Sequence, residues 1–219
     1  MLSLILVFFF GILAFRGIAL GNSEEMDDIP RKVTDKLGGL WDIAHQGMRD
    51  NRLLRAEKAL LTILKIDSKN AAAYNRLGIL YAKQKEYKDA IDCFEIASSI
   101  DPTASSLHNL GLIYYETENY PKAATAFEQA IKIEDDLAAR HIAYAKVQEK
   151  LGNGKLMIQE LERAVELEPI KESYTLLQKG YESQGMQAEA DVINSKLNRA
   201  NSALKNKPKR VSRPKRVVI

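Results

Sequence analysis

The histidines of this sequence are the side chains best suited to metal binding or proton transfer, and they are His45, His108 and His141. Metal ligation and general-base chemistry require such a histidine to have Cys, carboxylate or further His side chains at a suitable spacing. No Cys, carboxylate or further His side chain occurs at metal-ligand spacing around these three residues, and a His-Glu-x-x-His motif is absent. The sequence therefore predicts no metal site.

Motifs for nucleophilic catalysis and for phosphate binding are also missing from the sequence. The single cysteine, Cys93, follows an apolar helical pattern beside Phe94, which indicates a small packing residue, and one cysteine allows no intramolecular disulfide. Gly152 and Gly154 enclose one asparagine, a stretch too short for a phosphate cradle and suited to a turn between helices. We therefore expect a non-catalytic protein without a cofactor.

A helix-turn-helix pattern is clearest in residues 71–103. Apolar and small side chains recur there at steps of three and four, pause at a turn at Lys85-Glu86, resume, and end at Pro102. Two such short amphipathic helices cannot bury both of their apolar faces alone, so further copies must pack beside them. The residues that carry the pattern are Tyr74, Leu77, Gly78, Tyr81, Tyr87, Ala90, Phe94 and Ala97.

The same pattern recurs before and after this stretch. The copy at 104–137 is nearly complete, with Leu107, Gly111, Tyr114, Ala123 and Phe127, whereas the flanking copies are looser. A period of about 34 residues with this signature resembles the tetratricopeptide repeat. The resemblance implies an all-α fold, an α-solenoid of about five helix-turn-helix units. The predicted units are 37–70, 71–103, 104–137, 138–171 and 172–204.

The segment at residues 1–20 is apolar apart from Arg16. A helix of that length reaches about 30 Å, enough for the hydrocarbon core of a bilayer. We interpret it as a single-pass membrane anchor, joined to the repeats by a polar linker at 21–36. A cleaved signal peptide is the alternative, because Ala19-Leu20-Gly21 would fit a cleavage site, but no positive residue precedes the apolar run. A buried soluble helix would require a partner helix of matching hydrophobicity, which the sequence lacks.

The orientation of this anchor follows from the basic residues. The chain has no Lys or Arg before the apolar run, whereas Arg16, Arg31, Lys32 and Lys36 lie within it or after it. The positive-inside rule then places the N-terminus outside and the repeats in the cytoplasm.

The C-terminal tail, residues 205–219, has a composition unlike the rest of the chain. Seven of the 32 Lys and Arg lie there with no acid, leaving 25 basic against 29 acidic residues in residues 1–204. Two prolines and this charge predict a disordered segment. It could act as a solubilising terminus, contact an anionic membrane leaflet, or contact nucleic acid, although no aromatic residues are interleaved for base stacking. The charged residues are Lys205, Lys207, Lys209, Arg210, Arg213, Lys215 and Arg216.

The tetratricopeptide resemblance also implies a binding surface. In that family the first helix of each unit lines a concave groove that binds extended peptides or partner helices. Trp41 has an alternative interpretation, packing against the linker or the second unit, and His108 and Tyr115 could belong to an ordinary half-exposed face. The implied groove residues are Trp41, His45, Asn75, Ile79, Lys83, His108, Leu112, Tyr115 and Lys146.

One specific family ligand can be tested on the sequence. Co-chaperones of this family clamp the carboxylates of an acidic C-terminus with Lys and Asn on one first helix, Asn on the next, and Lys and Arg on the third. Asn109 matches the central position of that clamp, but four flanking positions do not, which argues against such an adaptor. The positions that fail are Asn75, Ile79, Ala139 and Ala143.

The sequence thus predicts a non-catalytic, membrane-anchored scaffold that binds a protein or peptide partner. By confining its groove to a surface, such a protein would raise the effective concentration of that partner there. Two alternatives remain open at this point. One is an exported, signal-cleaved binding module, and the other is an adaptor that contacts nucleic acid through its tail.

Overall fold

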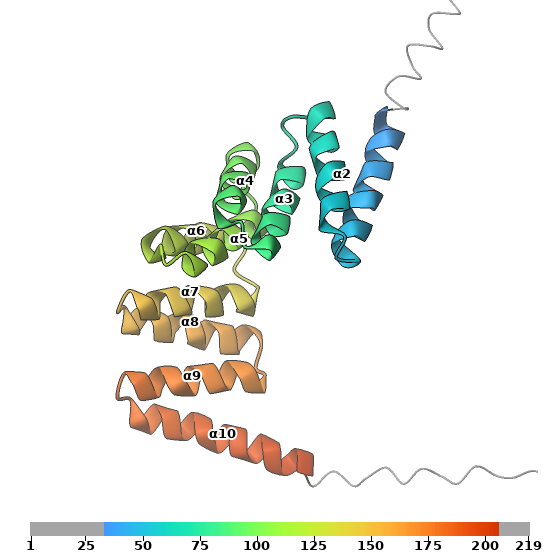
Figure 1. Cartoon of the computed structure of the whole chain (residues 1–219). Helices are drawn as coiled ribbons and strands as arrows, with labels where there is room; N and C mark the ends of the chain where they lie inside the picture. The colour runs from blue at the N-terminus through green and yellow to red at the C-terminus, as the bar shows by residue number, and fades with distance from the viewer. Residues whose placement is uncertain (1–32, 206–219) are drawn as a thin grey trace, which may run out of the picture. The chain divides into compact units, whose positions relative to one another are not determined.

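The computed structural model describes residues 33–205, which form helices joined by short connections and contain no strand (Figure 1). The predicted all-α solenoid of helix-turn-helix units is therefore confirmed. The helices are 33–49, α2 Leu53–Ile66, α3 Ala71–Gln84, α4 Tyr87–Ile100, α5 Ala104–Glu116, α6 Tyr120–Ile133, α7 Ala138–Lys150, α8 Gly154–Leu167, α9 Lys171–Ser183 and α10 Gln187–Lys205.

The predicted anchor at 1–20 and nearly all of the predicted basic tail lie outside the described residues. Within residues 33–205, none of the helices combines the length and the hydropathy that crossing a bilayer requires. Two predicted boundaries differ from the structure. Residues 33–36, expected in the linker, begin the first helix, because no proline or glycine interrupts them, and α10 includes Lys205, which was expected in the tail.

The chain divides into two compact units, with the boundary between Ile100 and Asp101. In the first unit, helix 33–49 pairs with α2 and α3 pairs with α4, around a core that contains Leu60, Ile63 and Leu77. In the second unit, α5–α6, α7–α8 and α9–α10 are successive hairpins, and a core that contains Leu161 and Leu177 joins the last four helices. Each unit buries its apolar faces between neighbouring hairpins, as helical repeats require.

The turn within each hairpin has one recurring backbone geometry. Asn51, Lys85, Glu118, Gly152 and Gly185 have φ values of 57°, 65°, 60°, 75° and 72°. At each turn the N–H of the following residue donates to the carbonyl five positions before it, as between Glu86 N and Tyr81 O at 2.9 Å. This is the Schellman termination, whose left-handed residue is most easily supplied by glycine.

Replacing Lys85 or Glu118 with glycine is expected to raise the free energy of unfolding by about 0.5–1 kcal/mol. A side chain with positive φ is strained, and glycine removes that strain while adding some entropy to the unfolded chain. Gly152→Ala is the matched reverse change and should destabilise the protein by a similar amount. Chemical denaturation measures both changes, and a loss of stability in both glycine variants would contradict the strain argument.

The contact between the two helices of a hairpin depends on a missing side chain. A Cβ atom at Gly78 would lie 2.7–2.8 Å from ring atoms of Phe94, and one at Gly111 would lie 2.9–3.0 Å from ring atoms of Phe127. Both rings are buried, with 1% and 0% of their surface exposed. Glycine therefore lets the phenylalanine of the second helix lie directly on the backbone of the first. A small residue at this position of the repeat predicts such a close contact between the two helices.

Two tyrosines connect consecutive hairpins through polar contacts. The hydroxyl of Tyr81 on α3 donates to Glu57 of α2 at 3.0 Å, and that of Tyr181 on α9 donates to Glu162 of α8 at 2.6 Å. Burial, followed by the carboxylate that accepts the hydrogen bond, raises the pKa of each hydroxyl to about 12. Both tyrosines are therefore protonated donors throughout the physiological range and hold successive hairpins together.

Candidate partner-binding groove

A hollow of about 360 Å³ lies between α5 and α7 in the second unit. The two helices are the first helices of successive hairpins, and the ring of Phe127 reaches the hollow from α6 behind them. The lining is mainly apolar, with one acidic and one basic side chain. The residues that line it are His108, Leu112, Tyr115, Glu116, Phe127, Ala139, Ile142, Ala143 and Lys146.

Four of the residues that the sequence analysis proposed for a groove line this one hollow. His108, Leu112 and Tyr115 stand at steps of four and three on α5, so they share one face of that helix, and Lys146 faces them from α7. Leu112 has 39% of its surface exposed, although its neighbours Gly111 and Ile113 are buried. An exposed apolar side chain that lines a hollow is a candidate contact for a partner.

Other lining residues were not proposed as site residues. Phe127 had been interpreted only as a packing residue, and Gly111 is the signal that could have placed it here, because that glycine lets the ring approach α5. Ala139 and Ala143 had been considered only as positions that fail the carboxylate clamp. Their small side chains leave the space that a longer residue would fill.

Aromatic rings fix the shape of the α5 side of the hollow. The His108 ring meets the Phe127 ring edge-on, with centroids 5.4 Å apart, and Tyr115 meets Tyr120 in the same way at 5.7 Å. Such pairs stabilise each other by about 0.5–1.5 kcal/mol beyond the area that they bury. The rings are therefore held in place before any ligand arrives.

His108 is held in its neutral form by its surroundings. Burial, followed by the positive charge of Arg140 on α7, lowers the pKa of the imidazole below its usual value of 6.5. Its Nδ1 atom is buried and has no hydrogen-bond partner among the described residues. The His108 imidazole, which lines the hollow, is consequently uncharged at neutral pH.

This lowered pKa makes stability depend on pH in a defined direction. Below pH 6.5 the unfolded chain binds a proton at this residue more readily than the folded one, so the contribution of His108 to stability declines as the pH falls through that window. Titration of the imidazole Cε1 proton by NMR should give a midpoint below 6.5 for His108. His108→Gln should flatten the pH dependence of the melting temperature in that range, and a midpoint above 6.5 would contradict the assignment.

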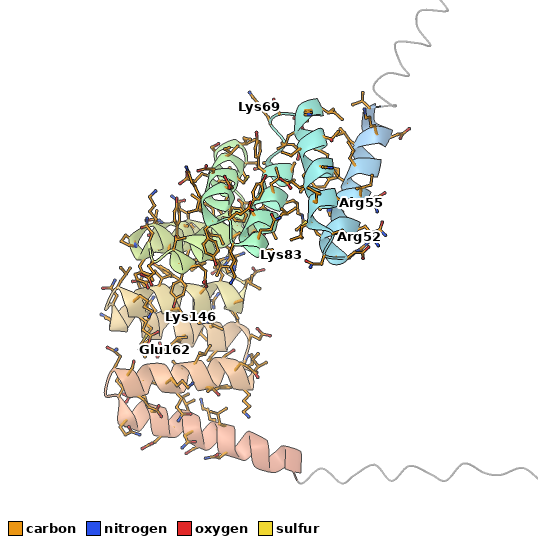
Figure 2. The ribbon with its side chains drawn as sticks, viewed as in Figure 1. Arg52, Arg55, Lys69, Lys83, Lys146 and Glu162 are labelled. Atoms are coloured by element: carbon orange, nitrogen blue, oxygen red, sulfur yellow. The ribbon has the colours of Figure 1, made fainter. Side chains whose placement is uncertain are left out.

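A second, smaller hollow of about 140 Å³ lies between α7 and α9. Ile142 and Lys146 of α7 line both hollows and so stand between them. Figure 2 shows Lys146 on α7. The residues that line the second hollow are Ile142, Ala145, Lys146, Glu149, Met157, Leu161, Leu176, Lys179 and Gly180.

The remaining proposed groove residues lie in the first unit. Trp41 and His45 are ring neighbours on helix 33–49, with centroids 5.5 Å apart, and Trp41 packs partly buried against the core of that unit. The packing interpretation of Trp41 therefore accounts for its position. On α3, Asn75 and Ile79 are half-buried, whereas Lys83 is exposed in the last turn, where Figure 2 labels it.

The surroundings of Cys93 do not activate its thiol. Burial, followed by the charges of Asp89 and Asp92, raises the pKa of the Cys93 thiol to about 11, so this thiol is protonated and a poor nucleophile. Within residues 33–205, no group of His, Cys, Asp and Glu side chains is arranged to hold a metal ion.

The comparison with known protein families agrees with this architecture. Residues 69–136 match the family model described as tetratricopeptide repeat. This segment is made of tetratricopeptide repeats. The match covers α3 to α6, the hairpins whose signature residues are most complete, and the other hairpins of the described residues share their turn geometry.

Solved structures show the same fold. A crystal structure of MamA superposes with a TM-score of 0.71 at 21% identity, covering 81% of this chain and 98% of MamA. MamA from Desulfovibrio magneticus RS-1 gives 0.69 at 15% identity, with 77% and 97% covered. YrrB, described as a TPR protein with an unusual peptide-binding site, gives 0.62 at 20% identity, with 70% and 80% covered. No curated protein matches the sequence.

Proposed function

We propose that this protein is a non-catalytic adaptor that binds an extended segment of a partner protein in the groove along α5, α7 and α9. The observation that carries this proposal is the hollow of about 360 Å³, whose lining combines apolar, aromatic and charged side chains. Leu112 and Tyr115 supply apolar contact area, and Lys146 supplies a charge at the rim. Protein interfaces combine an apolar centre with a polar rim in this way.

The groove suits a peptide better than a compact small molecule. It continues from one hollow across Ile142 and Lys146 to the next, so contacts extend over three successive helices. An extended chain can make such distributed contacts, whereas a compact ligand would occupy one hollow. The peptide-binding site in the description of YrrB, which shares the fold, supports this class of ligand.

We also propose that residues 1–20 anchor the protein in a membrane with the repeats on the cytoplasmic side, and that the basic tail contacts anionic lipid. The apolar composition of residues 1–20 and the seven basic residues of 205–219 support these assignments. Protease protection of a C-terminal tag, in intact cells and in inverted vesicles, tests the orientation. Digestion of the tag from outside the cells would contradict it.

Removing two side chains from the hollow should abolish partner capture. Leu112→Ala combined with Tyr115→Ala deletes an exposed apolar contact and an aromatic ring, and each such contact in an interface contributes roughly 1–2 kcal/mol. Together these losses amount to about 2–4 kcal/mol, so we expect the double variant to bind the partner about 30–1,000-fold more weakly. Quantitative co-purification from cells, with circular dichroism to verify helicity, measures this change.

The matched control is Ile133→Ala combined with Leu137→Ala. Both residues belong to the second unit and have 47% of their surface exposed, but neither lines the hollows. This variant should capture the same proteins as the wild type. If the groove variant retains capture at unchanged helicity, the partner binds elsewhere and the proposed function is wrong.

A further inference from the structure

The outer face of α2 carries a stripe of leucine and lysine side chains. The buried residues of α2 all lie on one side of the helix, and four residues on the opposite side fall within about 60° of each other at 3.6 residues per turn. No acidic residue lies among them. We call these residues the α2 stripe: Leu54, Lys58, Leu61 and Lys65.

The equivalent positions of the other second helices contain no leucine. The helices α2, α4, α6 and α8 each have 14 residues, so positions can be compared by their distance from the helix start. Glutamate occupies the position of Leu61 in α4, α6 and α8, and lysine occupies the position of Leu54 in α4 and α8. Leu54 and Leu61 have 63% and 41% of their surface exposed. Because three other hairpins fold with polar residues at these positions, folding does not require leucine there.

Positive charge accompanies the two leucines. Lys58 and Lys65 belong to the stripe, and Arg55, which Figure 2 labels on α2, borders it. Within the part of the chain that the structure describes, none of these three side chains takes part in an ion pair. Glu57, the acidic residue of α2, is half-buried outside the stripe and accepts the hydrogen bond of the Tyr81 hydroxyl. The stripe therefore combines exposed aliphatic area with positive charge that no acid neutralises.

The surface of an anionic bilayer matches both properties of the stripe. On a helix that lies in a membrane surface, aliphatic side chains enter the boundary between headgroups and acyl chains, and basic side chains contact anionic headgroups. A nucleic acid would match only the lysines, because phosphate contacts leave both leucines in water. Residues 21–32 extend over at most about 43 Å, so the first hairpin stays close to a bilayer that residues 1–20 enter.

We propose that the α2 stripe lies on the surface of an anionic bilayer, with Leu54 and Leu61 at the level of the headgroups and Lys58 and Lys65 against their negative charges. None of these residues lines either hollow of the groove, so lipid contact leaves the groove open. This inference rests on the proposed membrane location and adds the surface through which the first unit meets the lipid.

The test uses the full chain reconstituted into phosphatidylcholine vesicles, with or without phosphatidylserine. An environment-sensitive fluorophore is attached through Leu54→Cys in a Cys93→Ala background, which leaves one thiol to label. With phosphatidylserine present, its emission should shift to the blue and nitroxide-labelled lipids should quench it. Both effects should be weaker in phosphatidylcholine alone. The same label attached through Lys155→Cys, at the equivalent position of α8, should report water in both kinds of vesicle.

Further variants separate the charged from the apolar contribution. Lys58→Glu combined with Lys65→Glu should lower the ratio of lipid-bound to free label at least about tenfold, because each basic residue attracts an anionic surface. Lys88→Glu combined with Lys155→Glu makes the same change of charge at exposed residues outside the stripe and should leave the ratio nearly unchanged. Leu61→Glu gives α2 the residue type that the equivalent positions carry, so it should release the label from lipid at unchanged helicity.

Flotation of the vesicles distinguishes a failure of this inference from a failure of the proposed anchor. If the protein floats with the vesicles but the label at position 54 stays in water, or responds equally in Lys58→Glu combined with Lys65→Glu, the inference is overturned and the anchor is retained. If the label responds to protein concentration without lipid, a second copy covers the stripe, which also overturns it. If the protein does not float, the proposed anchor is wrong and the inference falls with it.

Discussion

His141→Ala is expected to lower the free energy of unfolding by about 2–5 kcal/mol, because it removes a buried side chain that makes two hydrogen bonds and leaves both of its partners unpaired. His141 lies on α7 with 3% of its surface exposed. Its Nε2 atom is 2.9 Å from the carbonyl oxygen of Asp135, and its Nδ1 atom is 2.7 Å from a carboxylate oxygen of Glu160 on α8. The ring therefore bridges α8 and the connection after α6 through both of its nitrogen atoms.

The effect is large because the alanine variant leaves two acceptors without a donor. The Glu160 side chain is 13% exposed, so its charge would remain largely buried without a partner. The same contacts tie α7 to α8 and to the connection after α6, and thereby hold the helix that separates the two hollows. A loss of partner affinity should therefore accompany the loss of stability.

Two controls define this prediction for chemical denaturation. Lys132→Ala breaks an ion pair of the same 2.7 Å length with Glu128, but those side chains are 69% and 52% exposed, so the loss should stay below about 1 kcal/mol. His141→Leu combined with Glu160→Leu removes both polar partners and should recover most of the stability. If His141→Ala destabilises no more than Lys132→Ala, the buried pair does not hold α7 in place.

Gly111→Ala is expected to lower the free energy of unfolding by about 1–3 kcal/mol, the range for overpacking a closely packed core. The new methyl group would stand 2.9 Å from the Phe127 ring, which is fully buried and packs edge-on against His108. If the Phe127 ring moves away from the methyl group, it displaces His108 or changes the shape of the hollow that both residues line. Gly111→Ala should therefore also weaken peptide binding, although Gly111 does not line the hollow.

Gly39→Ala is the matched control for this substitution. Gly39 also lies within a helix, but a Cβ atom there has no neighbour within 4 Å. Alanine should stabilise that helix by about 0.5–1 kcal/mol through its higher helix propensity. Thermal denaturation of both variants compares one chemical change in two environments. If Gly111→Ala raised the stability by a similar amount, the Phe127 ring would not be in close contact with the backbone of α5 at Gly111.

The sequence predicted the fold because each hairpin repeats the same physical requirements. Gly78 with Phe94 and Gly111 with Phe127 recur at the contact between paired helices, and left-handed turn residues recur at nearly equal spacing. It also predicted four lining residues, because residues at steps of three and four share a helix face.

The sequence could not predict how the groove differs from hairpin to hairpin. The unequal hollows depend on which side chains are short, as at Ala139 and Ala143, and on the approach of Phe127 from another helix. The role of His141 was hidden for the same reason. Its partners are a backbone carbonyl and a carboxylate 19 positions away, so spacing along the chain carries no signal of these contacts.

Site-specific photo-cross-linking in cells tests the central claim most directly. A photoreactive amino acid is placed at position 112 in one variant and at position 133 in another, two apolar positions with 39% and 47% of their surface exposed. We predict that position 112 cross-links to a defined partner segment, that Ala143→Leu suppresses this product, and that position 133 gives none. Equal products from both positions, or none from position 112, would contradict binding in the groove.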